Sequence, residues 1–185
     1  MSTDADYLRS LFPNRYRVAG VWLKHYCIGH VFLLERIDSP FVNPGKSPQL
    51  GDLRIALGIC KRDYLEASSW LQRASSRWDM PLRFCTPKRF EKGVYQFADY
   101  INKSFTHPVC WQGASGRKMG MPFLQSVKLT LLLLGKTETE ALSCPLSLAL
   151  WDYTGYWELR DRMQIVGSED REAMKMAKML AERRN

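Results

Sequence analysis

Apolar residues recur every three or four positions through most of the chain, which is the period of an amphipathic helix. The pattern is clearest at residues 88–105, where five apolar residues share one side of the predicted helix: Phe90, Val94, Phe97, Ile101 and Phe105. Residues 22–38 and 50–60 also carry helical stripes, and residues 64–78 suit a partly exposed helix that includes Leu65 in its apolar pattern. The chain is therefore predicted to be all-α, or mainly α.

Gly29 lies inside the predicted helix at residues 22–38, where a glycine costs about 1 kcal/mol of stability relative to alanine. A close crossing by another helix would give this glycine a packing reason. Three prolines and a glycine then interrupt the pattern over residues 39–48, which predicts an ordered surface loop.

Turn and capping residues organise the carboxy-terminal half. Pro122 opens a predicted helix and Gly135 closes it. Thr137 and Glu140 have the spacing of a capping box, in which each side chain satisfies a backbone N–H of the other residue. We expect a helical hairpin here.

Ser143 is predicted to cap the next helix, with Pro145 in its first turn. One side of that helix is apolar and is expected to be buried or to meet a partner: Leu146, Ala149, Leu150, Tyr153 and Trp157.

The last predicted helix begins at Ser168, with Glu169 and Asp170 in its first turn and Arg183 and Arg184 at its end. Its apolar stripe contains Met174, Ala177, Leu180 and Ala181. Packing against the core is the favoured interpretation, and a methionine-rich contact surface is the alternative.

Residues 106–122 combine prolines and glycines without a period and are predicted to form a connector or binding loop. The whole chain, residues 1–185, is of single-domain size, so we predict one compact multi-helix domain, with a subdivision near residues 106–122 as the alternative.

The net charge of +8 favours an acidic partner or a nucleic acid. The basic residues are, however, spread along the chain, and their densest groups are only pairs, as on an ordinary solvated surface. A basic helical nucleic-acid-binding regulator therefore stays as an alternative.

Five cysteines without a CxxC pair suit reduced thiols in a cytoplasm. The amino terminus lacks the cationic start and apolar run of a secretion signal. The most apolar stretch, residues 123–134, is shorter than the roughly 20 residues that span a bilayer. We expect a cytoplasmic protein without a membrane partner.

Common catalytic and nucleotide-binding motifs such as GxxxxGK[ST], GxGxxG, GxSxG and HExxH are missing from the sequence. His107 and Cys110 permit a nucleophile-and-base hypothesis, but a His-Pro turn beside a buried cysteine explains them as well. We predict that the protein is not an enzyme and uses no cofactor; an unrecognised enzyme is the second alternative.

The strongest metal candidate combines His25, Cys27 and His30, with Cys60 on a neighbouring segment. Zinc needs about four converging ligands, whereas on a helix His25 would point away from Cys27 and His30. We therefore predict no metal site.

Six tryptophans are many for this length and are candidates for interface anchors. The residues predicted to bind a partner are Trp111 in the connector and an aromatic group in the following helix, Trp151, Tyr153, Tyr156 and Trp157.

Two passages resemble tail-assembly chaperone-like proteins of tailed phages. One is VAGVWLKHYCIGHVFLLERIDSPFV followed by GDLRIALGICKRD, and the other is LLLLGKTETEALSCPLSLALWDY. The resemblance implies a helical, non-catalytic morphogenesis protein that binds the phage tape-measure or tail-tube protein and helps tail subunits to polymerise, without a cofactor.

Overall fold

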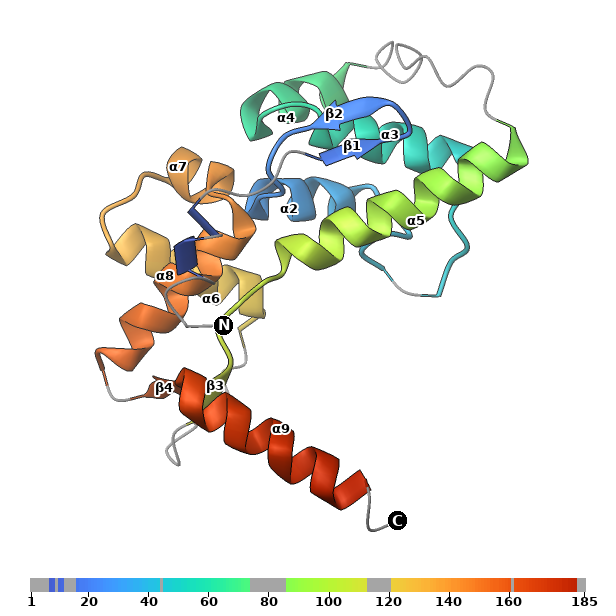
Figure 1. Ribbon diagram of the computed structural model, residues 1–185. Coiled ribbons are helices and arrows are strands. Elements are labelled where there is room, and N and C mark those ends of the chain that lie inside the picture. Colours follow the sequence, from blue (N-terminus) through green and yellow to red (C-terminus); the bar gives the residue numbers. More distant parts are fainter. Residues whose placement is uncertain are drawn as a thin grey trace.

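The computed structural model describes residues 7–8, 10–11, 16–43, 45–73, 86–112, 121–160 and 162–182. Helices dominate this part of the chain, which confirms the mainly α prediction (Figure 1). The helices are α2 Ile28–Arg36, α3 Leu50–Cys60, α4 Tyr64–Gln72, α5 Pro87–Ser104, α6 Phe123–Leu133, α7 Glu138–Ser143, α8 Leu146–Glu158 and α9 Ser168–Glu182. The short strands are β1 Tyr16–Val18, β2 Val21–Leu23, β3 Cys110–Gln112 and β4 Met163–Ile165.

A β-hairpin occupies the start of the segment that was predicted to be helical from residue 22. Strand β1 pairs antiparallel with β2, so that Tyr16 lies opposite Leu23. Ala19 and Gly20 both have positive φ angles, as in the tight turns whose twist suits a hairpin. The helix prediction was therefore wrong for this part, and α2 begins only at residue 28.

The extended segment between β2 and α2 is held by backbone hydrogen bonds from two distant parts of the chain. Lys24 N–H donates to the carbonyl of Cys60 over 2.8 Å, and Leu146 N–H donates to the carbonyl of Tyr26, also over 2.8 Å. These bonds tie the hairpin to the end of α3 and to the start of α8.

The largest core cluster draws on helices from both halves of the chain. Its fully buried members include Ile28, Leu34, Leu53, Leu57, Phe97, Leu131, Leu146 and Leu150. Most of the predicted stripe of α5 enters this cluster, with Phe97 and Ile101 buried and Phe90 and Val94 packed at its edge. The prediction was wrong for Phe105, which follows the last residue of the helix and is 37% exposed. The assignment of residues 1–185 to one domain stays a prediction.

Helix α4 packs through a different face from the one predicted. Ala67 and Trp70 are buried, whereas Leu65 is 57% exposed. The ring of Trp70 lies directly on α3, because a methyl group at Gly58 would come within 2.3 Å of it. Residues 74–78 of the predicted helix lie outside the described residues.

The capping prediction for α7 is confirmed. Glu140 N–H donates to Oγ1 of Thr137, and Thr137 N–H donates to the carboxylate of Glu140 over 2.8 Å. The preceding helix ends, as predicted, before Gly135, which has a φ of +89°.

Ser143 does not cap α8, and that prediction was wrong. It is the last residue of α7, and Pro145 occupies the N-cap position of α8. Only two residues separate the end of α7 from the start of α8. Ser143 is still part of α7 and therefore cannot occupy the N-cap position of α8. The apolar side of α8 is buried as predicted, through Leu146, Ala149, Leu150 and Tyr153, with Trp157 half-buried.

Part of the predicted connector is a strand. Cys110 in β3 lies opposite Ile165 in β4, and the two strands are antiparallel. The interpretation of residues 110–112 as unpaired loop was therefore wrong, while residues 113–120 lie outside the described residues. No helix in the described ranges is long and apolar enough to cross a membrane.

Candidate functional site

The most conspicuous candidate surface lies on α9, which extends away from the other helices in Figure 1. Its apolar residues, apart from Met179, fall within an arc of about 160° at 100° per residue. We call their surface the α9 face: Ala173, Met174, Met176, Ala177 and Leu180. Glu172 lies outside this arc, on the other side of the helix.

The α9 face is open to solvent. Met174 is 44% exposed, Met176 is 64% exposed and Leu180 is 62% exposed. No other described helix or strand packs extensively against α9. The favoured prediction, that this stripe packs on the core, was wrong; the side chain of Ala181, also predicted in the stripe, and Arg183 and Arg184 lie outside the described part.

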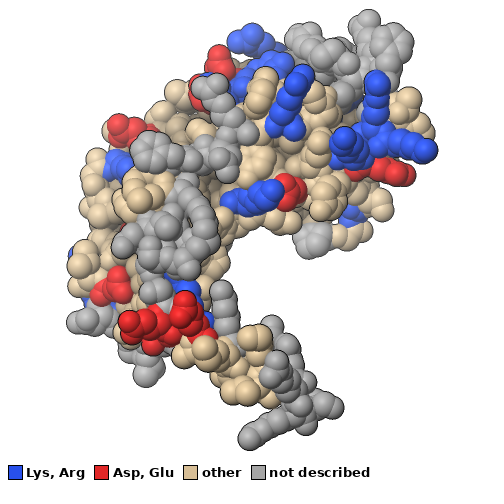
Figure 2. All heavy atoms as spheres, viewed as in Figure 1, with Lys and Arg blue, Asp and Glu red and all other residues tan. Residues whose placement is uncertain are grey.

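Local contacts fix where α9 begins. Only two residues separate it from β4, and Nε of Arg171 donates to the carbonyl of Val166 over 3.2 Å. Glu169 and Asp170 occupy the first turn, where the helix dipole favours negative charge. Figure 2 shows acidic residues gathered at this end of the helix.

Two of the five aromatic residues predicted to bind a partner are internal. Trp151 is 7% exposed and meets Tyr7 edge to face at 5.5 Å between ring centroids. Tyr153 is 4% exposed and meets Phe123 in the same way at 5.5 Å. In this conformation, neither Trp151 nor Tyr153 forms part of an open surface.

The other three predicted residues are placed differently. Tyr156 and Trp157 are half-buried, and each has an arginine over its ring, Arg160 at 4.5 Å and Arg162 at 5.5 Å. Trp111 contributes its backbone to β3, opposite Gln164, and its side chain lies outside the described part of the structure. A partner-binding role for these residues stays a prediction.

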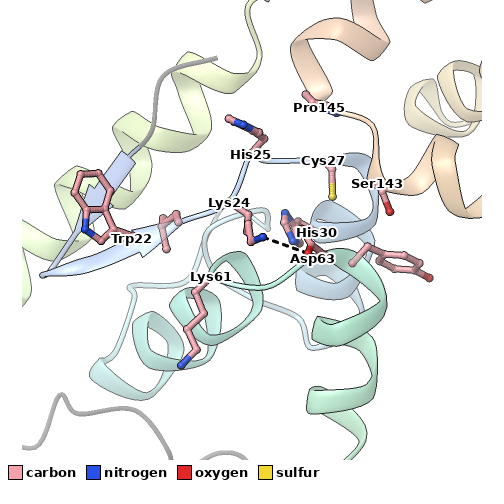
Figure 3. Close-up of a pocket in the computed structure, with 11 residues that line it drawn as sticks. Trp22, Lys24, His25, Cys27, His30, Lys61, Asp63, Ser143 and Pro145 are labelled. Atoms are coloured by element: carbon pink, nitrogen blue, oxygen red, sulfur yellow. Dashed lines mark hydrogen bonds and ion pairs between the residues drawn. The ribbon is translucent and has the colours of Figure 1, made fainter. Parts of the chain in front are cut away.

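A second candidate is a pocket of about 580 Å³ between β2, the start of α4 and the turn from α7 to α8 (Figure 3). Trp22, 60% exposed, and Tyr64 contribute aromatic rings to its lining. Nζ of Lys24 forms an exposed ion pair with Asp63 over 3.3 Å. His30 belongs to the lining although the residue is only 1% exposed.

The buried His30 ring is oriented by one backbone group. Its Nε2 lies 2.8 Å from the carbonyl oxygen of Arg62, which only accepts hydrogen bonds, so Nε2 carries the proton and donates. Its Nδ1 is buried within the protein. Burial lowers the pKa of His30 from its ordinary 6.5, which favours this neutral form.

The residues of the metal hypothesis do not converge. Figure 3 shows His25 directed away from Cys27 and His30. Burial raises the pKa of the Cys27 thiol to about 12, so it is a poor thiolate ligand at neutral pH. Among the residues that the structure describes, no three metal-binding side chains come together.

His107 and Cys110 both contact the same carbonyl oxygen. Nδ1 of His107 lies 2.9 Å from the Pro108 carbonyl oxygen, and Sγ of Cys110 donates to that oxygen over 3.3 Å. Burial raises the pKa of Cys110, whereas an activated nucleophile needs a lowered one. This geometry does not make an activated pair.

Comparison with known proteins gave no match of any kind: no family model, no curated protein and no solved structure matches the chain. The resemblance to phage tail-assembly proteins therefore stays a prediction, as do the non-enzyme assignment and the tape-measure or tail-tube partner.

Proposed function

We propose that this protein is a non-catalytic assembly factor that binds a helical segment of another protein through the α9 face. The observation that carries the proposal is the exposure of this face on a helix without an extensive packing partner. A 15-residue helix is only marginally stable by itself in water. A partner that covers the apolar side would stabilise it.

The composition of the α9 face indicates which kind of partner fits. Alanine side chains allow another helix to approach closely, and methionine side chains adapt to irregular surfaces. Helices that bind membrane surfaces usually carry Trp, Phe or Leu opposite a strongly basic side, whereas α9 mixes Glu172 with Lys175 and Lys178. An amphipathic helix of a partner protein fits these features better than a lipid surface.

The phage assignment rests on the two sequence passages that resemble tail-assembly chaperone-like proteins. In this proposal the partner is the tape-measure or the tail-tube protein. The chaperone covers an apolar or coiled-coil segment of its partner until tail subunits displace it. No catalytic step or cofactor is needed for this role.

The first experiment is a pull-down of the tagged protein during phage assembly in its host, with mass spectrometry of retained proteins before and after high salt. The double variant Met176→Glu/Leu180→Glu introduces charge on the α9 face. Leu133→Glu is the matched control, because Leu133 is 69% exposed on α6, away from α9. Both variants are expected to fold, since none of these side chains is buried.

We expect the wild-type protein and the Leu133 variant to retain a tape-measure or tail-tube protein in high salt, and the α9 variant to lose it. Equal retention by all three would show that the α9 face is not the contact. Recovery of nucleic acid alone, lost in high salt, would replace the proposal with the nucleic-acid-binding alternative.

A further inference from the structure

We propose that the protein has a second binding surface, which takes a single-stranded nucleic acid. We call it the hairpin face, because its residues lie on the hairpin of β1 and β2 and on the adjoining side of α5: Arg17, Trp22, Arg89 and Lys92. This inference depends neither on the α9 face nor on the proposed assembly function. It combines an exposed aromatic ring with an excess of positive charge.

The hairpin turns one side to the core and the other to solvent. Val18 and Leu23 are buried on the inner side. Arg17 and Trp22 lie opposite each other across the two strands, so their side chains share the outer side. Trp22 is 60% exposed, and the Arg17 guanidinium carbon lies 5.8 Å from the centroid of its ring. An aromatic ring beside a cation is thus open to solvent.

Helix α5 continues this surface beyond the turn of the hairpin. Ala19 N–H donates to Oε1 of Gln96 over 3.2 Å, and a methyl group at Gly93 would lie 3.5 Å from Cβ of Ala19. Gly93 and Gln96 therefore mark the side of α5 that meets the hairpin. At 100° per residue, Arg89 lies within about 40° of both, and Lys92 lies about 40° from Gln96. The side chains of Arg89 and Lys92 are exposed.

The hairpin face carries net positive charge. Asp99, the carboxylate on the same side of α5, forms an ion pair with Lys103 over 2.7 Å. Glu91 lies about 160° from Arg89 around the helix, on its far side. None of the ion pairs between described residues engages the three cations of the hairpin face. Figure 2 shows Lys and Arg side chains gathered over the hairpin and the start of α5.

A single strand fits this combination better than other anionic partners. Its phosphates attract lysine and arginine side chains, and its unstacked bases can lie on an aromatic ring, because every base presents a π face. A duplex keeps its base faces stacked inside the helix and offers only phosphates and groove edges. An acidic protein segment would engage the cations but would leave the Trp22 indole without a flat partner.

The test is fluorescence anisotropy of labelled single strands of about 12 nucleotides, a length within the usual site sizes, titrated with the full chain. DNA and RNA strands of one sequence are compared with the DNA duplex of that sequence and with a labelled polyglutamate peptide. Each titration is repeated over a series of salt concentrations, because the slope of log affinity against log salt reports the phosphate contacts.

Three variants probe the hairpin face. Trp22→Ala removes the ring, and Trp22→Phe keeps a smaller one. Arg89→Gln/Lys92→Gln removes two positive charges. The matched control is Arg36→Gln/Lys46→Gln, which removes two exposed positive charges from the end of α2 and from the loop after it. In Figure 1 this loop and the hairpin lie on different sides of α5.

We expect Trp22→Ala to weaken strand binding by about fivefold or more, the loss of one stacked base, and Trp22→Phe to retain most of the affinity. Arg89→Gln/Lys92→Gln should reduce the salt slope by about 1.4, or about 0.7 for each phosphate contact, while the control keeps it. Tighter binding of the RNA strand would assign the face to RNA, and equal binding would assign it to either strand. Both results support the proposal.

Four results would overturn the proposal: no binding of either strand at low salt, equal affinity for strand and duplex, unchanged binding in Trp22→Ala, or equal loss in the control variant. Polyglutamate bound as tightly as the strands would assign the face to an acidic protein instead. The α9 face is tested by retention of a protein in high salt with other variants, so failure of one proposal is distinguishable from failure of the other.

Discussion

Gly29 faces the ring of Tyr64 so closely that a methyl group on the glycine would lie 2.3 Å from Cδ2 of the tyrosine. The same methyl group would lie 3.0 Å from the carbonyl oxygen of Leu142. The first turn of α2 is thus wedged between α4 and α7, and no larger side chain fits there without movement of its neighbours. This contact also forms one side of the pocket, because Tyr64 belongs to its lining.

Gly29→Ala should therefore lower the free energy of unfolding by about 1–3 kcal/mol, the usual cost of overpacking. Gly51→Ala is the matched control, because Gly51 is also the second residue of a helix and has nothing within 4 Å of its added methyl group. The control should lose no stability. Urea denaturation of the two variants would measure the difference, and equal midpoints would contradict the packing argument.

His30 should make stability depend on pH in the weakly acidic range. Its folded pKa is lowered by burial, so below pH 6.5 the unfolded chain binds more protons than the folded one. The stability that neutral His30 contributes is fully present above pH 6.5, its pKa in the unfolded chain. It is lost as the pH falls from 6.5 toward the lower pKa of the folded protein.

The measurement is the free energy of unfolding as a function of pH. The non-titrating variant His30→Gln should lose this slope, while His25→Gln should keep it, because His25 is exposed. An unchanged slope in His30→Gln would show that another group carries the pH dependence.

The buried cysteines should resist alkylation in the folded protein. Burial raises the pKa of Cys27 to about 12 and that of Cys144 to about 11, so almost no thiolate is present at pH 8. We expect iodoacetamide to modify the half-buried Cys110 before either of them. Peptide mapping gives each rate separately, and fast modification of Cys27 in folded protein would contradict its burial.

The capping box of α7 should contribute measurable stability. Thr137→Ala removes the oxygen that accepts from the Glu140 backbone N–H and is expected to cost about 1 kcal/mol. Thr137→Ser keeps that oxygen and should retain most of the stability. Chemical denaturation distinguishes the two variants, and a Thr137→Ala midpoint equal to that of wild type would show that the cap is dispensable.

The features that were predicted correctly from the sequence depend on interactions between residues that are close together in the chain. The stripe that includes Phe97 and Ile101 in α5, the capping box at Thr137 and the apolar side of α8 each depend on residues a few positions apart. A close approach of another helix at Gly29 was also expected, although the sequence did not identify Tyr64 as the neighbouring residue. Helix period and capping act within one element, so they can be read without knowledge of the remaining fold.

The β-hairpin of β1 and β2 was missed although its signal was present. Ala19 and Gly20 stand between two short runs rich in β-forming residues, which is a hairpin pattern. The helical spacing of the residues that follow concealed it. This part of the chain is not helical, because β2 pairs with β1 and the extended segment after it forms backbone hydrogen bonds with Cys60 and Leu146.

The candidate sites depended on tertiary structure for a different reason. An apolar stripe shows which side of a helix avoids water, but not whether the rest of the chain covers it. The apolar side of α8 is covered, whereas that of α9 stays exposed. Likewise, the buried His30 ring is held by the carbonyl of Arg62, which lies 32 positions away in the chain. The sequence by itself determined the helices and their apolar sides; only the packing of distant segments decided which sides stay open and which polar groups are buried.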